Sequence, residues 1–173
     1  MNFKKNKIGV LGGSFDPAHR GHLAISKEAM KRLKLKKIIW AITRKNPFKK
    51  KSNISLLTRI KHCKKIIGKN TFIKVKFYED IIRSNKTINL VNYLNRNKKN
   101  EIYFLMGADN LINFHKWHKW KTISQQCNIL VFDRHGYKKK CLNSITYKRL
   151  DKKNVKFIEF NKVNISSSQL RKI

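Results

Sequence analysis

The chain has 173 residues, of which 42 are Lys or Arg and nine are Asp or Glu, so its formal net charge is +33. A hydrophobic content of 40%, with ten Phe, five Tyr and three Trp, is enough for one packed core and excludes a wholly disordered chain. No apolar run approaches the roughly 18 residues of a membrane span, so we expect one cytoplasmic domain over residues 1–173 with no membrane partner.

Short apolar runs alternate along the chain with segments of helical spacing. In chain order the pattern predicts strand 8–11, helix 23–33, strand 37–43, helix 56–67, strand 72–77, helix 87–94, strand 101–106, helix 110–124, strand 128–132, strand 155–160 and the start of a helix at 166–173. Because strands that alternate with helices form βαβ units, the expected fold is α/β: a Rossmann-like open parallel sheet with helices on both faces. Ligands of such sheets bind beyond the carboxyl ends of the strands.

The segment from Gly12 to Leu23, GGSFDPAHRGHL, connects the first predicted strand to the first predicted helix. Gly12 and Gly13 lack a Cβ, so their backbone can approach an anion closely, and the helix N-terminus adds N–H donors and a partial positive charge. His19 and His22 are three residues apart, so within a helix they would share one face. The segment therefore predicts a phosphate-binding cradle, in which Asp16 either braces the loop or caps the helix.

Other readings of this segment are possible, since a lone Gly-Gly is usually a turn and two histidines are usually surface residues. The segment nevertheless holds three of the seven glycines, one of the two prolines and two of the six histidines. A metal site is not expected, because two histidines without a nearby cysteine are a weak zinc signal. Cys63, Cys127 and Cys141 are odd in number and widely spaced, so we expect them to be reduced thiols.

The positive charge suggests nucleic-acid binding, but its composition argues against a dedicated binder. The basic residues are 33 Lys and nine Arg, although Arg is the usual residue for bidentate phosphate and base contacts. They are also spread along the whole chain, and Asn and Ile, which share A/T-rich codons with Lys, are abundant as well. We therefore expect only non-specific contact with nucleic acid.

The sequence resembles the nucleotidyltransferase superfamily, whose motif G-x-F-D-P-x-H-x-G-H is matched by residues 13–22. Further segments make it similar to the nicotinate-nucleotide adenylyltransferase family, and the resemblance runs collinearly from about residue 8 to 171. These segments are Asn46-Pro47-Phe48-Lys49, Gly107-Ala108-Asp109-Asn110, Phe114-His115-Lys116-Trp117 with Trp120, Asp133-Arg134 and Ile165-Ser166-Ser167-Ser168-Gln169-Leu170-Arg171.

The resemblance implies that the 5′-phosphate of nicotinate mononucleotide attacks the α-phosphorus of ATP, with Mg²⁺ present, to give nicotinate adenine dinucleotide and pyrophosphate. It implies that His19 and His22 are catalytic and hold the ATP phosphates. Asp109 would accept a hydrogen bond from a ribose hydroxyl, Trp117 would stack on the pyridine ring and Thr87 would hold the nicotinate side. The other ATP or phosphate ligands implied are Gly12, Gly13, Ser14, Lys49, Ser166, Ser167, Ser168 and Arg171.

Three mild departures from the family pattern are Lys86, His135 and Ser168, and only two residues follow Arg171, so we expect a shortened C-terminal helix. A pantetheine-phosphate adenylyltransferase is the nearest alternative in the same fold, although it usually has Thr where His19 stands and does not account for the Gly107–Asn110 segment or the Trp-rich stretch. A basic nucleic-acid-binding protein with a vestigial site is the alternative from another class. The sequence leaves the oligomeric state open.

Overall fold

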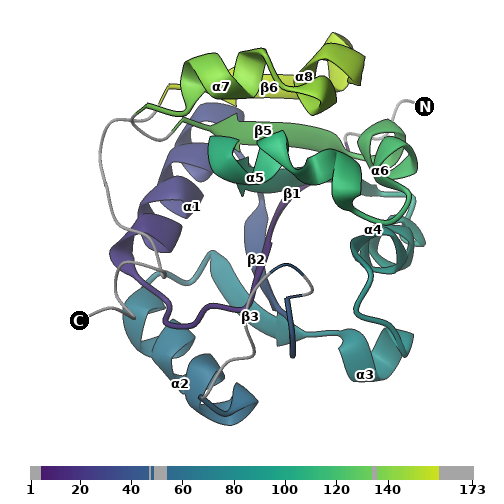
Figure 1. The fold of residues 1–173 in the computed structure, drawn as a ribbon. Helices are drawn as coiled ribbons and strands as arrows, with labels where there is room; N and C mark the ends of the chain where they lie inside the picture. Colours follow the sequence, from purple (N-terminus) through teal and green to yellow (C-terminus); the bar gives the residue numbers. More distant parts are fainter. Residues whose placement is uncertain (1–4, 47, 49–53, 134–135, 160–173) are drawn as a thin grey trace.

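A six-stranded parallel sheet organises the fold of the described residues in a computed structural model (Figure 1). These residues are 5–46, 48, 54–133 and 136–159. The strand order is β3-β2-β1-β4-β5-β6, and every neighbouring pair is parallel. The strands are β1 (Asn6–Gly13), β2 (Lys37–Ile42), β3 (Ile73–Phe77), β4 (Asn100–Gly107), β5 (Asn128–Phe132) and β6 (Val155–Ile158). Since the chain runs outward from β1 in both directions, the order reverses between β1 and β4, which is where such sheets bind ligands.

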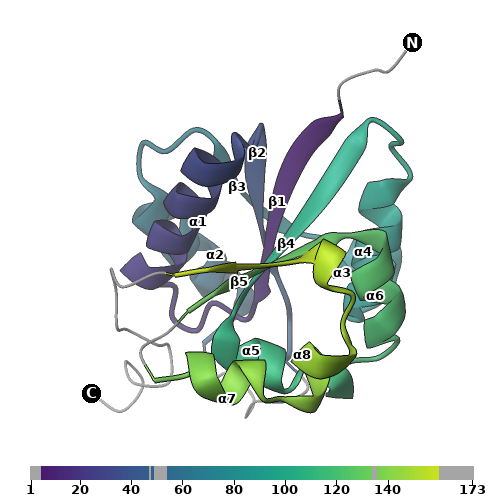
Figure 2. The same cartoon turned by 90° about the horizontal axis from the view of Figure 1, so that it is seen from above.

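Helices cover both faces of the sheet (Figures 1 and 2). Two long helices, α1 (Arg20–Leu33) and α2 (Leu56–Ile67), lie on one face. The other face is covered by α4 (Thr87–Asn95), α5 (Ala108–Ile112), the 3₁₀ turn η1 (Phe114–Lys116) and α6 (Trp120–Gln126). The remaining short elements are α3 (Glu79–Ile82), α7 (Lys138–Leu142), α8 (Ile145–Arg149) and η2 (Lys152–Asn154).

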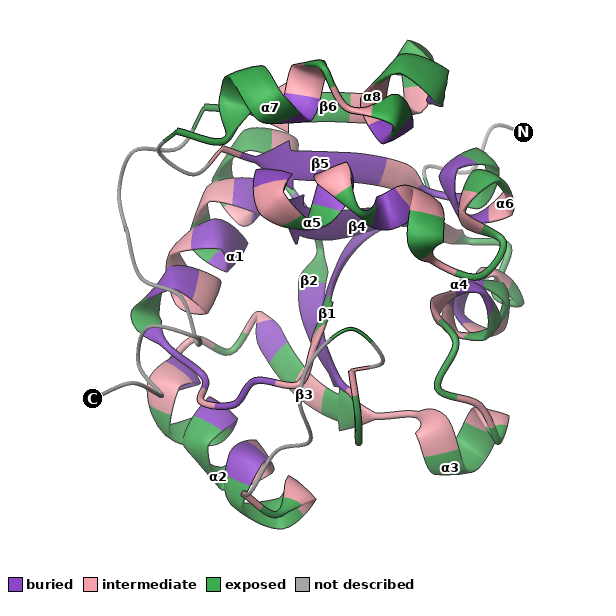
Figure 3. Ribbon diagram, viewed as in Figure 1, coloured by how far each residue is buried: buried purple, intermediate pink, exposed green. Residues whose placement is uncertain are grey.

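The four inner strands β1, β2, β4 and β5 contain runs of consecutive buried residues (Figure 3), whereas the edge strands β3 and β6 are partly exposed. Successive side chains of a strand point to opposite faces. Val10 and Ile39 accordingly pack with α4 and α6, whereas Leu11 and Trp40 pack with α1 and α2. Continuous apolar runs such as Ile38–Ile42 therefore fit a central parallel strand.

The predicted α/β parallel sheet with helices on both faces is confirmed, but one predicted helix is wrong. Residues 110–124 do not form a single helix: they divide among α5, η1 and α6. Trp117 has extended backbone angles and Lys119 has φ +53°, and neither conformation continues a helix. The aromatic residues there pack into the core from several short turns instead of from one helix face.

The carboxyl ends of the first and last strands also differ from the prediction. Gly12 and Gly13 continue β1 instead of forming the loop, and they pair with Ala41 and Ile42 of β2. The last strand ends at Ile158, with the predicted residue Phe160 outside the described range. The sequence reading missed the four- and five-residue helices α3, α7 and α8, because such short helices carry little periodicity.

The cysteines are three buried free thiols. Burial raises the pKa of Cys63 and of Cys127 to about 12, so both are protonated at neutral pH. This agrees with the expected reduced thiols. In the part of the chain that the structure describes, no helix combines the length and apolarity that a membrane crossing requires.

Added salt is expected to raise the melting temperature, since the surface is strongly basic. Exposed lysines such as Lys31, Lys61 and Lys121 repel one another within the compact state. Screening shortens the Debye length from about 30 Å at 0.01 M salt to about 3 Å at 1 M. Thermal unfolding across that NaCl range, without substrate, measures the effect, and a melting temperature independent of salt would contradict it.

Candidate active site

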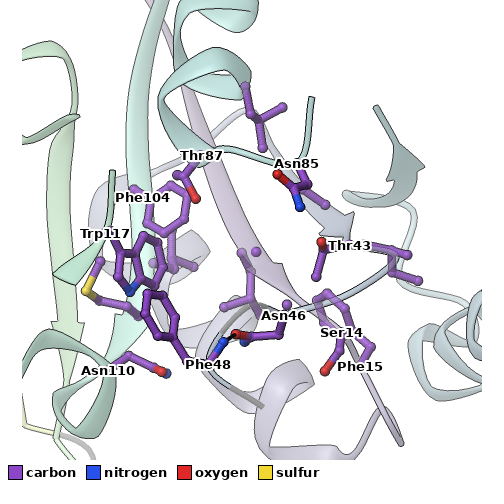
Figure 4. A pocket seen from close by; sticks show the side chains of 18 of the residues that line it. Ser14, Phe15, Thr43, Asn46, Phe48, Asn85, Thr87, Phe104, Asn110 and Trp117 are labelled. Atoms are coloured by element: carbon purple, nitrogen blue, oxygen red, sulfur yellow. Dashed lines mark hydrogen bonds between the residues drawn. The ribbon is translucent and has the colours of Figure 1, made fainter. Parts of the chain in front are cut away.

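A pocket of about 600 Å³ opens at the carboxyl ends of β1, β2 and β4 (Figure 4). β1 and β4 stop pairing at Leu11 and Leu105, which leaves a crevice at the reversal of strand order. In the view of Figure 4, Thr87, Phe104 and Trp117 lie on one side of the pocket, and Ser14, Phe15 and Thr43 lie on the other. Predicted site residues that line it are Gly12, Gly13, Ser14, His19, His22, Thr87, Asp109 and Trp117.

His19 and His22 form a reciprocal cap at the start of α1. The Nδ1 atom of His19 accepts from the Gly21 N–H at 3.1 Å, and the Nδ1 atom of His22 accepts from the His19 N–H at 3.2 Å. In the neutral rings the proton then lies on Nε2, so each Nε2 is a donor. The ring centroids are 3.8 Å apart. The two histidines are brought together as predicted. His19 is the N-cap of α1 and does not lie within its first turn. It therefore takes the capping role that we considered for Asp16.

Two aromatic side chains, Phe15 and Trp40, pack against the His22 ring. Phe15 lies 4.8 Å from His22 and stacks on Trp40 with centroids 5.0 Å apart and 16° between the planes. The Trp40 indole donates to Ser26 Oγ at 2.8 Å, which links this stack to α1. The backbone of Phe15 has φ +48°, a strained angle for a bulky residue, and it turns the side chain inward beneath the histidine.

The opposite side of the pocket combines aromatic rings with a helix N-terminus. Trp117 packs perpendicular to Phe104, with ring centroids 6.0 Å apart and 88° between the ring planes. Thr87 begins α4, where the first N–H groups have no acceptor within the helix. Ser84 Oγ already accepts from the Lys86 N–H at 3.1 Å. The N–H groups of Thr87 and Ile88 are the next donors at this end.

Asp109 follows β4 in the first turn of α5 and lines the pocket. It lies close enough to Cys141 to act on the thiol: burial first, then the carboxylates of Asp133 and Asp109, raise the Cys141 pKa to about 11. Tyr78 also lines the pocket, and burial and the neighbouring Tyr93 raise its pKa.

The comparisons with known proteins agree with this geometry. A model of the cytidylyltransferase-like family matches residues 10–173. A nicotinate-nucleotide adenylyltransferase from Pelagibacter ubique is 68% identical over 173 residues, which are 100% of this chain and 96% of the relative. One from Bradyrhizobium sp. is 36% identical, covering 80% of this chain and 72% of the relative. This chain belongs to the nicotinate-nucleotide adenylyltransferases of the cytidylyltransferase-like family.

The solved structures add a likeness of fold. Nicotinic acid mononucleotide adenylyltransferase of Plasmodium falciparum, solved in complex with NaAD, superposes with a TM-score of 0.80 at 21% identity. The alignment covers 96% of this chain and 83% of that chain. The nucleotidyltransferase-like fold predicted from the motifs is therefore confirmed.

Part of the predicted adenylyltransferase site lies outside the described residues. These predicted ligands are Lys49, Ser166, Ser167, Ser168 and Arg171. Within the described residues there is no group of three or more His, Cys, Asp or Glu side chains placed to hold a metal ion.

The sequence alone did not identify two charged residues next to the pocket. Arg59 on α2 donates to the carbonyl oxygens of Ser14 and Thr43, and Glu79 on α3 accepts from the Thr43 hydroxyl. A signal for Arg59 was available, since it lies three residues after Leu56 and four before Cys63, on the apolar stripe of its helix. No comparable signal marks Glu79.

Proposed function

We propose that this chain transfers the adenylyl group of ATP to nicotinate mononucleotide. The 5′-phosphate oxygen forms a bond to the α-phosphorus of ATP, the bond from that phosphorus to the bridging oxygen breaks, and pyrophosphate leaves. The observation that carries the proposal is one pocket that places two adjacent histidine donors at a helix N-terminus across from an aromatic ring and a second helix N-terminus.

The histidine side of the pocket supports ATP binding. Attack of one anion on another requires neutralised charge and aligned reactants, and alignment alone can supply about 7 to 11 kcal/mol. The Nε2 atoms of His19 and His22 would donate to phosphate oxygens, with His22 at the reacting α-phosphate. Gly12 and Gly13 would leave room for the phosphates. A Cβ on Gly12 would come within 3.3 Å of the Phe104 ring, so this position has little space for a side chain.

The acceptor side supports nicotinate mononucleotide. The Trp117 indole has an apolar face of the size of a pyridine ring, and aromatic pairs of this kind contribute about 0.5 to 1.5 kcal/mol. The Thr87 hydroxyl and the first N–H groups of α4 would donate to the nicotinate carboxylate, with the helix dipole favouring its negative charge. Asp109 would accept from a ribose hydroxyl of ATP.

Mg²⁺ fits this pocket as a partner of ATP. The ion prefers oxygen ligands, keeps several waters and usually binds through substrate phosphates with one or two carboxylates. Asp109 is the strand-end carboxylate of the pocket whose chemistry would allow such a contact, directly or through water. When bound, the ion would neutralise charge on the phosphate oxygens.

A panel of acceptors tests the proposal. We expect the protein to release pyrophosphate from ATP and Mg²⁺ when nicotinate mononucleotide is present, and to form nicotinate adenine dinucleotide in equal amount. Nicotinamide mononucleotide should react more slowly, because its neutral amide gains less from the N-terminus of α4. Coupled pyrophosphate detection with chromatography of the dinucleotide measures both products.

Two outcomes would overturn the proposal. Turnover with phosphopantetheine but not with nicotinate mononucleotide would assign the chain to the other adenylyltransferase reaction. Tight binding to duplex DNA or RNA at about 0.15 M salt, with no pyrophosphate released from any acceptor, would favour a nucleic-acid-binding protein.

A further inference from the structure

Arg59 is a buried cation that the proposed reaction does not use directly. Its side chain is 2% exposed although it lies on α2 among exposed lysines. Nη1 donates to the Ser14 carbonyl at 2.6 Å and to the Thr43 carbonyl at 2.8 Å, and Nη2 donates to the Arg44 carbonyl at 3.1 Å. One guanidinium therefore holds backbone from two separate segments.

These two segments adjoin each other on one side of the pocket (Figure 4). Ser14 follows β1 and begins the loop that leads to His19, whereas Thr43 and Arg44 follow β2. Ser14 and Thr43 both line the pocket. Burying an arginine is costly unless its charge is compensated by hydrogen bonds, and the planar fork of donors fixes the direction of each acceptor. One side chain therefore ties the two loops together beyond the last backbone bond between them, which the Thr43 N–H donates to the Gly13 carbonyl at 2.9 Å.

The second segment is tied onward to the acceptor side. Glu79 accepts from the Thr43 hydroxyl and, at 3.1 Å, from the Arg44 N–H. Arg44 also pairs with Asp80 at 2.7 Å. Glu79 and Asp80 form the first turn of α3, which leads through Ser84 into the N-terminus of α4. The connection runs from the histidine loop through Arg59 and Glu79 to the helix that carries Thr87.

We infer that Arg59 is a positioning residue that sets the histidine loop against the acceptor-binding segments. The inference rests on the proposed adenylyl transfer, in which rate depends on alignment of two bound anions. Arg59 acts through backbone carbonyls and not through the substrates. Its loss should therefore reduce turnover of the ternary complex more than it reduces the binding of either substrate alone.

Arg59→Lys tests this inference, because lysine keeps the charge but cannot hold three carbonyls in a planar fork. We expect kcat to fall by about tenfold or more, because the two substrates are no longer well aligned. The Kd of ATP and the Kd of nicotinate mononucleotide, each measured alone, should change less than about threefold. Hydrogen exchange should quicken in residues 14–18 and in residues 43–46 together. Lys65→Gln, an exposed change on the same helix, is the control and should leave all of these values unchanged.

A second variant, Glu79→Gln, keeps the inference testable if Arg59→Lys does not fold. Glu79→Gln removes the charge that holds Thr43 and Arg44 from the other side, and we expect a smaller fall in kcat with faster exchange confined to residues 43–46. Unchanged exchange in both segments of Arg59→Lys, or a kcat equal to wild type with only a lower melting temperature, would overturn the inference. If Arg59→Lys does not fold, an unchanged kcat in Glu79→Gln would overturn it. Hydrogen exchange needs no turnover, so it separates this failure from failure of the proposed reaction.

Discussion

Replacing His22 by alanine is expected to lower kcat by about 10²- to 10³-fold, the scale for losing one donor to charge that develops in the transition state. The His22 ring is placed for that role by its Nδ1 bond to the His19 N–H and by the Phe15 ring at 4.8 Å. Both contacts orient the ring, and the bond accepted by Nδ1 leaves the proton of the neutral ring on Nε2. The measurement is initial-rate pyrophosphate release at saturating ATP and nicotinate mononucleotide.

His22→Gln separates chemistry from helix capping. Alanine also removes the N3 half of the capping box, and such capping contacts contribute about 0.3 to 1.5 kcal/mol of stability. Glutamine at this helix position can still accept from the N-cap N–H, but it lacks the imidazole Nε2 donor. We expect Gln to restore the melting temperature and not the rate, while His62→Ala, an exposed change on α2, should alter neither. A kcat of His22→Ala within a few-fold of wild type would exclude this role for His22.

The sheet could be predicted from the sequence because its signal is local. Runs such as Ile38–Ile42 and Ile129–Phe132 are continuous and apolar, which is typical of strands buried on both faces. The division of residues 110–124 could not be predicted, since it depends on Lys119 adopting a left-handed backbone that nothing in its side chain favours. In that stretch the aromatic spacing reflects packing of Phe114, Trp117 and Trp120 against one another, not a helix face.

The site was predictable where scarce residue types gathered and not where common ones did. The two histidines were identified because the Gly, Pro and His of this Lys-rich chain concentrate in one segment, and the structure brings their rings to 3.8 Å. Arg59 is one basic residue among 42, and its burial follows only from the carbonyl oxygens that tertiary structure places around it. The +33 charge, the most prominent property of the sequence, identified none of these residues.

Phe15→Ala is expected to reduce the free energy of unfolding by about 3 to 5 kcal/mol, as for other buried phenylalanines, and to lower kcat as well. Phe15 is 2% exposed and packs between Trp40 and His22, so its removal leaves a cavity beneath the His22 ring. Its φ of +48° is unfavourable for alanine too. The variant therefore loses packing without relieving backbone strain.

Ile67→Ala is the matched control for this prediction. Ile67 is buried in the same core cluster but ends α2 and does not line the pocket. Its loss should cost about 2 to 5 kcal/mol and leave the kcat of the folded enzyme unchanged. Urea unfolding gives the stabilities, and kcat is measured well below the melting temperature of each variant. If Phe15→Ala lost stability but kept the wild-type kcat, the aromatic stack would contribute to the core alone, and the capping box would suffice to hold His22 in place.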